Sequence, residues 1–382
     1  MRTVLFANKI ATPVKTMTGI GRYVQELTLA LAALAGPGQE YQISSPKEKG
    51  FSGRPAWLAP NVEERWVPGA RKAIHLAWLT LNGPRLEQLV GDFDLLHNLH
   101  TSFPVPTRRP GVLTVHDLMP FEHPEWYPWY NPWGHRKAIA QSAKDGWSLI
   151  TPTAYVKDLM VKHDLADPER VHVVYEAVED TFRRPVADDV KAETCARYGI
   201  APGPFLLAVG RITVRKNLVL LVDAFARADV PGLTLVLAGS PHTSSKDVVA
   251  RIAHHGLEDR VRITGFVDDD DLPALLQSAA ALVHPSVDEG FGIPPLEAMA
   301  GGTPVIVARA ASLPEIVDDA GMLVDPYDVG AWAAAFGELT QDDRRRAELA
   351  AAGLARSTTF SWERAARETL AVYDLTLAKS AV

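Results

Sequence analysis

The stretch "ALVHPSVDEGFGIPPLEAMAGGTPVIVA", residues 281–308, contains a strand, a loop, a helix and a second strand. "ALVH" and "TPVIVA", at its two ends, are short apolar runs typical of buried strands. Between them, Pro294 indicates where a helix begins and Gly301 where it ends. Because a helical connection joins parallel neighbours, this unit predicts a parallel sheet covered by helices.

The loop of this unit combines glycines with two acidic residues, Glu289 and Glu297. The backbone N–H groups expected at the helix start are those of Gly290, Phe291, Gly292 and Ile293. Such a start favours a phosphate, which glycine lets approach the backbone. Glu297, expected in the first helical turn, can accept hydrogen bonds from a ribose, and Glu289 from a second sugar. A solvated Glu289 and a Glu297 that complements the helix dipole are the alternatives for each residue alone. The combination with the glycines favours a ligand site.

The same alternation of strands and helices runs through most of the chain, in two series. The strand-like runs of the first series are residues 2–8, 93–99, 111–117, 147–153 and 171–178. Those of the second series are residues 205–211, 233–240, 261–267, 281–286 and 303–308. The predicted fold class is therefore α/β, with two doubly wound Rossmann-like domains facing across a ligand cleft. Their expected ranges are 1–182 and 183–360, followed by one amphipathic helix over 361–382 that must pack on a domain.

The composition excludes several classes of protein. The chain has 382 residues, a formal net charge of -7 and a single cysteine, Cys195. A negative balance argues against a nucleic-acid partner, and one cysteine excludes a disulfide framework within the chain. We expect a cytoplasmic protein, because the first residues read as a strand and not as a signal peptide. No apolar run approaches the ~20 residues of a membrane span, so membrane association is expected to be peripheral at most.

Two cations follow the first strand of the second series. Arg211 comes directly after "FLLAVG", and Lys216 lies just before the next helix. Two cations at a strand's carboxyl end can hold a diphosphate and stabilise it as it leaves. Solvated surface cations are the alternative.

The first series carries two weaker signals. Gly19 and Gly21 precede a helix, but Val24 stands where a dinucleotide fingerprint has its third glycine, so a helix-entry turn explains them equally well. His116 and Asp117 end a strand of this series. A lone histidine there is often structural, but His116 is expected to point into the cleft.

No metal site is predicted. The aspartate run Asp268–Asp271 precedes a helix, so N-capping and first-turn charge explain it. His254 and His255 have no partner at metal-ligand spacing.

Together these motifs resemble the retaining glycosyltransferases of family 4, which have the two-domain GT-B fold, over nearly the whole chain. The most specific match is the E-x7-E pair Glu289 and Glu297. The other matches are Arg211 followed by Lys216 and Asn217, Gly265–Val267, and "SWERAA" at residues 361–366. "TGIGRYVQEL" and "VHD" resemble a branch with many bacterial mannosyltransferases of surface polysaccharides.

The resemblance implies a hexosyltransferase of polysaccharide or glycoconjugate biosynthesis that retains the anomeric configuration and needs neither metal nor cofactor. A mannose-like or glucose-like sugar would pass from a nucleoside-diphosphate sugar to a sugar or glycoconjugate acceptor. The resemblance also implies that the last helix crosses back to the first domain. The roles that it implies are Glu297 for the donor ribose, Glu289 for the transferred sugar, Arg211 and Lys216 for the diphosphate, Gly19 and Gly21 for close approach of the donor, His116 for the sugar near its reacting carbon, and Val267 for the nucleobase.

Three other functions fit the same architecture. Nucleotide-sugar 2-epimerases share it, but they lack the E-x7-E loop followed by the "PPLEAMAGG" helix. A phosphorylase would show phosphate dependence. A non-catalytic nucleotide-sugar-binding module is disfavoured by the intact set of site residues.

Overall fold

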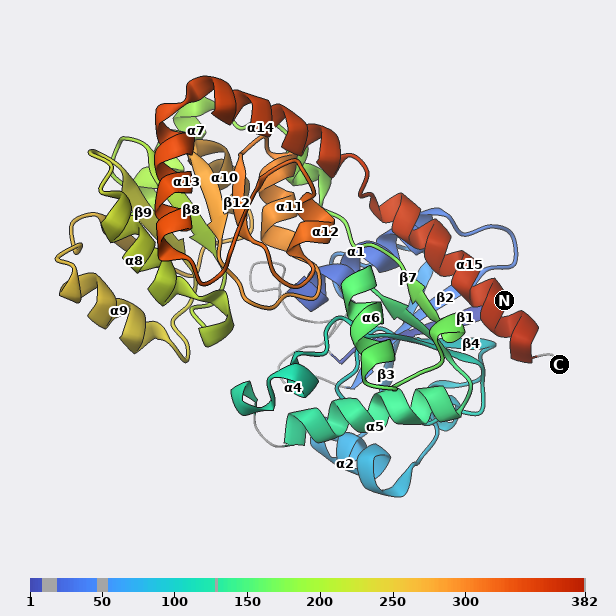
Figure 1. Cartoon of the computed structure of the whole chain (residues 1–382). Helices are drawn as coiled ribbons and strands as arrows, with labels where there is room; N and C mark the ends of the chain where they lie inside the picture. Colours follow the sequence, from blue (N-terminus) through green and yellow to red (C-terminus); the bar gives the residue numbers. More distant parts are fainter. Residues whose placement is uncertain (9–18, 47–53, 128–129, 381–382) are drawn as a thin grey trace. The chain divides into compact units, whose positions relative to one another are not determined.

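The computed structural model describes residues 1–8, 19–46, 54–127 and 130–380, and the chain divides into two compact units (Figure 1). Unit 1 comprises Met1–Glu176 and Ser361–Val382, and unit 2 comprises Ala177–Phe360. The chain leaves unit 1 after Glu176, earlier than the boundary expected at residue 182, and returns to it at Ser361.

Unit 1 is built on a seven-stranded sheet with the order β3-β2-β1-β4-β5-β6-β7, in which every pair is parallel. Its strands are β1 (Arg2–Phe6), β2 (Glu40–Pro46), β3 (Val62–Val67), β4 (Leu95–Asn98), β5 (Gly111–Thr114), β6 (Ser148–Thr151) and β7 (Val171–Val173). The sequence did not predict β2 or β3. The edge strand β3 reads "VEERWV", and charged residues of this kind are common on strands that lack a neighbour on one side.

Two apolar cores of unit 1 alternate along β1 and the residue that follows it. Val4 and Phe6 belong to one core, and Leu5 and Ala7 to the other. Successive side chains of a strand point to opposite faces, so β1 is buried on both sides. The helices of the unit are α1 (Gly19–Ala33), α2 (Arg71–Leu81), α3 (Leu86–Val90), α4 (Met119–Glu122), α5 (Tyr130–Lys144), α6 (Ala154–Lys162) and α15 (Trp362–Ser380).

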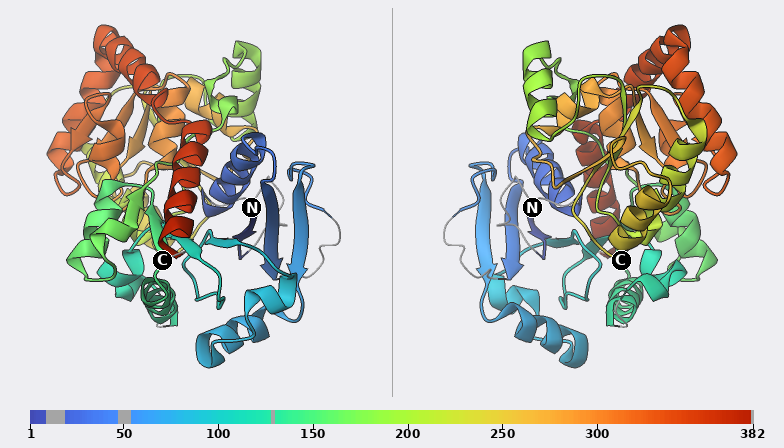
Figure 2. Two further views of the ribbon diagram at one scale, coloured as in Figure 1. Left: turned by 90° about the vertical axis from the view of Figure 1, so that its right-hand side faces the viewer. Right: turned by 90° about the vertical axis from the view of Figure 1, so that its left-hand side faces the viewer.

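The C-terminal helix α15 lies beside α1 within unit 1 (Figure 2). Ser361 caps the start of this helix, because the backbone N–H of Arg364 donates to Ser361 Oγ at 3.2 Å. Tyr373 is fully buried, and its hydroxyl lies 2.7 Å from Nδ1 of His97 on β4. The helix α15 therefore forms part of the core of unit 1.

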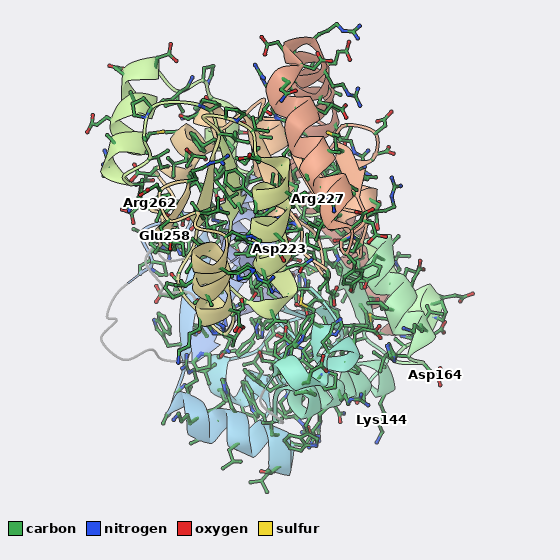
Figure 3. All side chains as sticks on the ribbon, turned by 60° about the vertical axis from the view of Figure 1, so that its left-hand side comes forward. Lys144, Asp164, Asp223, Arg227, Glu258 and Arg262 are labelled. Atoms are coloured by element: carbon green, nitrogen blue, oxygen red, sulfur yellow. The ribbon has the colours of Figure 1, made fainter. Side chains whose placement is uncertain are left out.

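Unit 2 has a six-stranded sheet with the order β10-β9-β8-β11-β12-β13, again with every pair parallel. Its strands are β8 (Phe205–Val209), β9 (Thr234–Ala238), β10 (Val261–Gly265), β11 (Ala281–His284), β12 (Val305–Ala308) and β13 (Met322–Val324), of which only β13 was not predicted. Its helices are α7 (Asp188–Arg197), α8 (Leu218–Ala228), α9 (Ser245–His254), α10 (Leu272–Ser278), α11 (Ile293–Ala300), α12 (Leu313–Val317), α13 (Val329–Gln341) and α14 (Asp343–Ser357). The charged side chains of Arg227, Glu258 and Arg262 are exposed on this unit (Figure 3).

The strand order of unit 2 reverses between β8 and β11, which pair although two strands separate them in the sequence. In open parallel sheets, ligands bind at such a switch point, beyond the carboxyl ends of the strands. The loops that follow β8 and β11 are therefore where a site is expected. Among the described residues, no helix is long and apolar enough to cross a membrane.

Candidate active site

The loop after β8 depends on two glycines. Gly210 has a φ of +127°, and a Cβ at this position would lie 3.1 Å from Cε of Lys216. A Cβ on Gly239, at the end of the neighbouring strand β9, would lie 1.9 Å from the carbonyl oxygen of Gly210. Side chains at these two positions would displace the Lys216 stem or the β8 loop, so glycine makes the buried path of Lys216 possible.

Lys216 closes a single 3-10 turn, Val214–Lys216, ahead of α8. The next residue, Asn217, has a φ of 52° and donates its side-chain amide to the carbonyl of Pro326 at 2.7 Å. The N–H of Val287, in the loop after β11, donates to the carbonyl of Arg215 at 2.9 Å. The first contact ties the end of this turn to the segment after β13, and the second holds the loops after β8 and β11 together, with Lys216 only 7% exposed.

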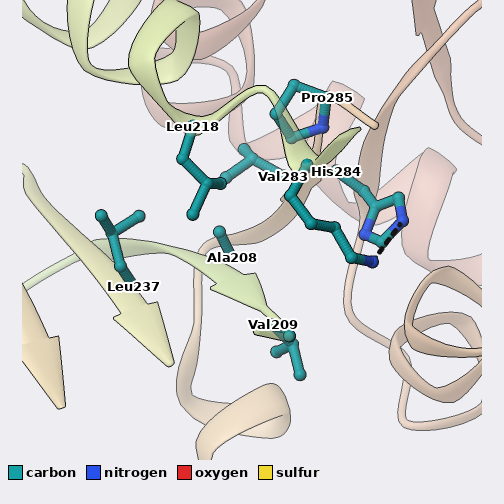
Figure 4. Close-up of a pocket in the computed structure, with 9 residues that line it drawn as sticks. Ala208, Val209, Leu218, Leu237, Val283, His284 and Pro285 are labelled. Atoms are coloured by element: carbon teal, nitrogen blue, oxygen red, sulfur yellow. Dashed lines mark hydrogen bonds between the residues drawn. The ribbon is translucent and has the colours of Figure 1, made fainter. Parts of the chain in front are cut away.

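Three donors from these loops and from β11 meet at one oxygen of Glu289. Arg215 Nη1 lies 2.5 Å from Glu289 Oε1, and Lys216 Nζ lies 2.7 Å from it. His284 Nε2, at the end of β11, is 3.1 Å from the same oxygen. His284 Nε2 also lies 3.4 Å from Lys216 Nζ (Figure 4). The cluster of Arg215, Lys216, His284 and Glu289 is called the carboxylate clamp below.

The charges of the carboxylate clamp follow from its surroundings. Burial would raise the pKa of Glu289, but Arg215, Lys216 and His284 together hold that pKa well below its ordinary value. Burial lowers the pKa of Lys216 to about 8, against the opposing effect of Glu289. Burial and the charge of Lys216 lower the pKa of His284 to about 4. At pH 7 the clamp therefore holds two cations, one carboxylate and a neutral imidazole, and it attracts anions.

A small pocket forms the floor of this region. It is lined by Ala208, Val209, Gly210, Lys216, Leu218, Leu237, Val283, His284 and Pro285 (Figure 4). Its volume of about 10 Å³ corresponds to a single water position, so a larger ligand would lie above the Lys216 ammonium and not inside this space.

The fully buried Ser312 holds the loop from Glu289 to Gly292 in place. Its hydroxyl lies 2.8 Å from the carbonyl oxygens of both Glu289 and Phe291. Gly292 has a φ of +112°, and a Cβ there would lie 2.9 Å from Leu313 Cδ2. Because Ser312 holds the carbonyls of Glu289 and Phe291, the loop has a fixed conformation where it joins the start of α11.

The start of α11 has backbone donors for an anion, and the anion site predicted there stays a prediction. Within the described ranges, the amide N–H groups of Phe291, Gly292 and Ile293 have no hydrogen-bond acceptor. Gly292 is the N-cap and supplies no side-chain oxygen of its own. A phosphate can use these donors together with the helix dipole.

The predicted helical position of Glu297 is wrong. The helix begins at Ile293, so Glu297 lies beyond the first turn, which contains no acidic residue. The alternative of a first-turn carboxylate that complements the helix dipole is therefore wrong as well, and Glu297 is only 2% exposed. The ligand role of Glu297 stays a prediction.

The remaining predicted residues of unit 2 lie at the same edge of the sheet. Arg211 lies two residues after the end of β8 and is exposed, without an ion pair to any residue that the structure describes. Val267 comes shortly after β10 and is half-buried, next to Phe266, whose side chain is 46% exposed. These positions fit a ligand that extends along the edge, but the roles of Arg211 and Val267 stay predictions.

In unit 1, His116 is 9% exposed, and both of its ring nitrogens have partners. Nδ1 lies 3.1 Å from a carboxylate oxygen of Glu176, and Nε2 lies 3.0 Å from the carbonyl oxygen of Leu99. Burial alone would lower the pKa of His116, but Glu176 and Leu99 raise it above its ordinary value. Because both partners can only accept, His116 satisfies them only as an imidazolium.

The two glycines of unit 1 lie at the start of α1. Gly19 is its first residue, and Gly21 follows within the first turn. The loop that precedes them, residues 9–18, lies outside the described residues. Their role in donor approach stays a prediction.

The capping interpretation of Asp268–Asp271 is wrong for the residue next to the helix. Asp271 occupies the N-cap of α10 but forms no side-chain cap, and α10 has no acidic residue in its first turn. Its carboxylate accepts instead from Arg197 at 2.7 Å and from the hydroxyl of Tyr198 at 2.8 Å. A nearby cation from α7 competes successfully with the backbone amides for this carboxylate.

Arg215, His284 and Ser312 were not among the predicted site residues. Arg215 stands beside Lys216 in "VRKN", and His284 is the last residue of a strand that ends at the same edge. Both positions give a sequence signal that could have been used. Ser312 gives none, because it contributes only through contacts with a loop distant in the sequence.

Comparison with known proteins identifies the family. The family described as "Glycosyltransferase Family 4" matches residues 17–182, and "Glycosyl transferases group 1" matches residues 194–356. The chain is 29% identical to O-antigen chain mannosyltransferase B of Escherichia coli, over 97% of this chain and 99% of that protein. It is 32% identical to the D-inositol 3-phosphate glycosyltransferase of Frankia alni, over 95% of this chain and 96% of that protein.

Solved structures share the fold at lower identity. Sucrose-phosphate synthase from Thermosynechococcus elongatus aligns with a TM-score of 0.75 at 21% identity, covering 99% of both chains. The lipopolysaccharide glycosyltransferase WaaG aligns with a TM-score of 0.73 at 18% identity, over 96% of this chain and 98% of that one. The predicted fold class, two doubly wound Rossmann-like domains of the GT-B type, is confirmed. The chain belongs to the group 1 glycosyltransferases of family 4.

Proposed function

We propose that the enzyme transfers a hexose from a nucleoside-diphosphate sugar to a sugar or glycoconjugate acceptor, with retention of the anomeric configuration and without a metal. The observation that carries the proposal is the carboxylate clamp at the β8–β11 switch point. Its Glu289 lies in the loop that leads into the start of α11. Its cations and the amides of that helix start suit a diphosphate, and Glu289 suits the hydroxyls of a sugar.

The diphosphate is proposed to lie against Lys216 and Arg211, with the amides of Phe291, Gly292 and Ile293 on its other side. Breaking the anomeric C–O bond leaves negative charge on the departing diphosphate. Preorganised cations and N–H groups stabilise that charge where it develops, which is usually the largest contribution to such a barrier. Glu297, buried beyond the first turn, is assigned to the ribose, and Val267 to the nucleobase.

Two relatives support a mannose-like donor sugar. The Escherichia coli relative is an O-antigen chain mannosyltransferase, and a 30% identical relative from Mycolicibacterium hassiacum is an MMP alpha-(1->4)-mannosyltransferase. Anabaena HepE, whose fold this chain shares, was solved in complex with UDP-glucose. A mannose-like or glucose-like donor is therefore the first choice for assay.

In unit 1 we assign donor contacts to Gly19, Gly21 and His116, as the family resemblance implies. His116 already uses both ring nitrogens on Glu176 and Leu99. A direct bond from its ring to a sugar hydroxyl would therefore have to exchange with one of these two contacts.

The experiment is a donor panel of UDP-, GDP-, ADP- and dTDP-linked glucose and mannose with simple glycoside acceptors. Release of nucleoside diphosphate measures turnover, and NMR of the anomeric proton in early product reports the stereochemistry. We expect one base to be preferred, retained configuration, and unchanged turnover after dialysis against EDTA. An inverted product, or activity that returns only when magnesium or manganese is added back, would contradict the proposal. A donor altered only at C2 would indicate an epimerase, and dependence on phosphate a phosphorylase.

A further inference from the structure

The cations that the proposed function assigns to the diphosphate include one that already has an anionic partner. Lys216 Nζ lies 2.7 Å from Glu289 Oε1, and the neighbouring Arg215 Nη1 lies 2.5 Å from the same oxygen. Both the Lys216 and the Glu289 side chains are about nine-tenths buried, so water screens this attraction poorly. The ligand-free site thus contains an internal anion beside the place where a diphosphate is proposed to bind.

We propose that Glu289 competes with the diphosphate for Lys216 and Arg215, so that the carboxylate clamp opens on donor binding and closes again on product release. This inference rests on the proposed function, because it assumes that the anion held by the cations is a diphosphate. A diphosphate draws the cations toward itself and weakens their hold on the carboxylate. Glu289 is then available to the hydroxyls of the transferred sugar.

The geometry of Glu289 supports this exchange. All three clamp donors, from Arg215, Lys216 and His284, converge on Oε1. No donor from the described residues bonds the second oxygen, Oε2. A sugar hydroxyl can therefore approach Oε2 before the clamp has opened, and Oε1 becomes available afterwards.

The exchange predicts different behaviour for donor and product. A complete donor supplies a diphosphate for the cations and hydroxyls for Glu289, so both sides of the broken ion pair regain partners. A diphosphate without its sugar leaves the buried carboxylate without compensation. By thermodynamic reciprocity, the sugar and the diphosphate strengthen each other's binding. Transfer of the sugar thereby weakens the hold on the remaining nucleoside diphosphate, whose release limits turnover in many enzymes.

The test uses inorganic pyrophosphate, which carries a diphosphate but neither a base nor a sugar. Glu289→Gln removes the competing charge while keeping the shape of the side chain. Calorimetry in metal-free buffer is expected to show pyrophosphate binding about ten-fold more tightly to this variant than to the wild type, because a hydrogen bond to a charged group is no longer broken. Transfer of the sugar is expected to fall in the same variant.

A matched control removes one negative charge elsewhere on unit 2. Asp229 is exposed, pairs with Arg260 at 2.9 Å and has a φ of 41°, a conformation that asparagine tolerates. Asp229→Asn is therefore expected to leave pyrophosphate affinity unchanged. Equal tightening in both variants would indicate a general effect of net charge and would overturn the proposed competition.

Lys216→Ala distinguishes failure of the proposed diphosphate site from failure of the proposed competition. If this variant binds pyrophosphate as well as the wild type does, the diphosphate site itself is wrongly placed. If Lys216→Ala weakens binding but Glu289→Gln does not tighten it, the site stands and the competition is rejected. If circular dichroism shows that the Glu289→Gln variant is unfolded, Glu289→Asp provides a second test. Aspartate keeps the negative charge but withdraws it from Lys216 and Arg215, so we expect a pyrophosphate affinity between those of wild type and Glu289→Gln. If a folded Glu289→Asp protein binds pyrophosphate no more tightly than wild type, the competition is also rejected.

Discussion

The Nζ of Lys216 lies 2.7 Å from Oε1 of Glu289, and the two side chains are only 9% and 10% exposed. The pair joins the loop after β8 to the loop after β11, strands that are sheet neighbours although two others separate them along the chain. One contact therefore links the predicted diphosphate residue to the predicted sugar residue.

Lys216→Ala is expected to reduce turnover by roughly 30- to 1,000-fold, because losing a charge-assisted contact to the departing diphosphate raises the barrier by about 2–4 kcal/mol. Arg211→Ala is expected to act in the same direction. Steady-state kinetics with the best donor of the panel measures both effects. Arg227→Ala, which removes an exposed cation of α8 (Figure 3), is the control and should retain full activity. Turnover within about threefold of wild type in both test variants would withdraw the diphosphate assignment.

The pH dependence of kcat/KM should report the ammonium of Lys216. Burial lowers the pKa of Lys216 from 10.5 to about 8, so the free enzyme loses this positive charge as pH rises through about 8. Because kcat/KM reflects the free enzyme, it should fall on that alkaline side. Lys216→Arg keeps its charge at all these pH values, so its profile should lack the fall. A wild-type profile that is flat to about pH 10, where an ordinary lysine titrates, would refute the assignment.

Glu297→Gln should weaken binding of the free nucleoside diphosphate, because the buried carboxylate is assigned to the ribose, which this ligand retains. Loss of hydrogen bonds to a charged group corresponds to about 1.5–3 kcal/mol, roughly 10- to 150-fold in Kd. Calorimetry with nucleoside diphosphate and with pyrophosphate distinguishes the sites, since pyrophosphate has no ribose and should bind Glu297→Gln almost normally. An equal loss of nucleoside diphosphate affinity in Glu289→Gln would mean that the two carboxylates do not divide the work.

Gly292→Ala should destabilise unit 2 and impair donor binding. The residue has a φ of +112°, and the new Cβ would lie 2.9 Å from Leu313 Cδ2. Strain of this kind costs about 1–3 kcal/mol, measurable by urea denaturation. Gly337→Ala in α13 is the matched control and should raise the free energy of unfolding. Nothing lies within 4 Å of its added Cβ, and alanine favours a helix interior. Stability of Gly292→Ala equal to that of wild type would show that the loop relaxes without cost.

Tyr373→Phe should lower the free energy of unfolding of unit 1 by about 1–3 kcal/mol, because it leaves Nδ1 of the buried His97 without a partner while Nε2 keeps Thr114. Burial lowers the pKa of His97 to about 3, so the imidazole stays neutral and the loss should be equal at about pH 5 and about pH 8. Tyr327→Phe, at a tyrosine that is 75% exposed, is the control and should change stability by less than about 0.5 kcal/mol. Pyrophosphate affinity, a property assigned to unit 2, should be unchanged in Tyr373→Phe. A strongly pH-dependent loss would mean that His97 titrates in the folded protein.

Much of the fold could be predicted from the sequence, because apolar periodicity is local. The runs around Leu96, Leu113, Leu207 and Val283 each form the strand that their pattern indicates. The strands β2, β3 and β13 were not predicted. Charged residues in β3 and the short length of β13 weaken the apolar pattern by which a strand is recognised. Among the site residues, Lys216 and Glu289 were predicted from their places next to strand ends.

The sequence by itself determined which residues stand at the carboxyl edge of the second sheet, because each of them follows a strand whose pattern is visible locally. Only the tertiary structure decided which of them touch. Arg215 and His284 reach Glu289 because β8 and β11 are sheet neighbours, and Asp271 turns away from its helix because Arg197 of α7 lies within 2.7 Å. Strand order and helix packing set these distances, and they are determined by burial over the whole domain and not by neighbours in the chain.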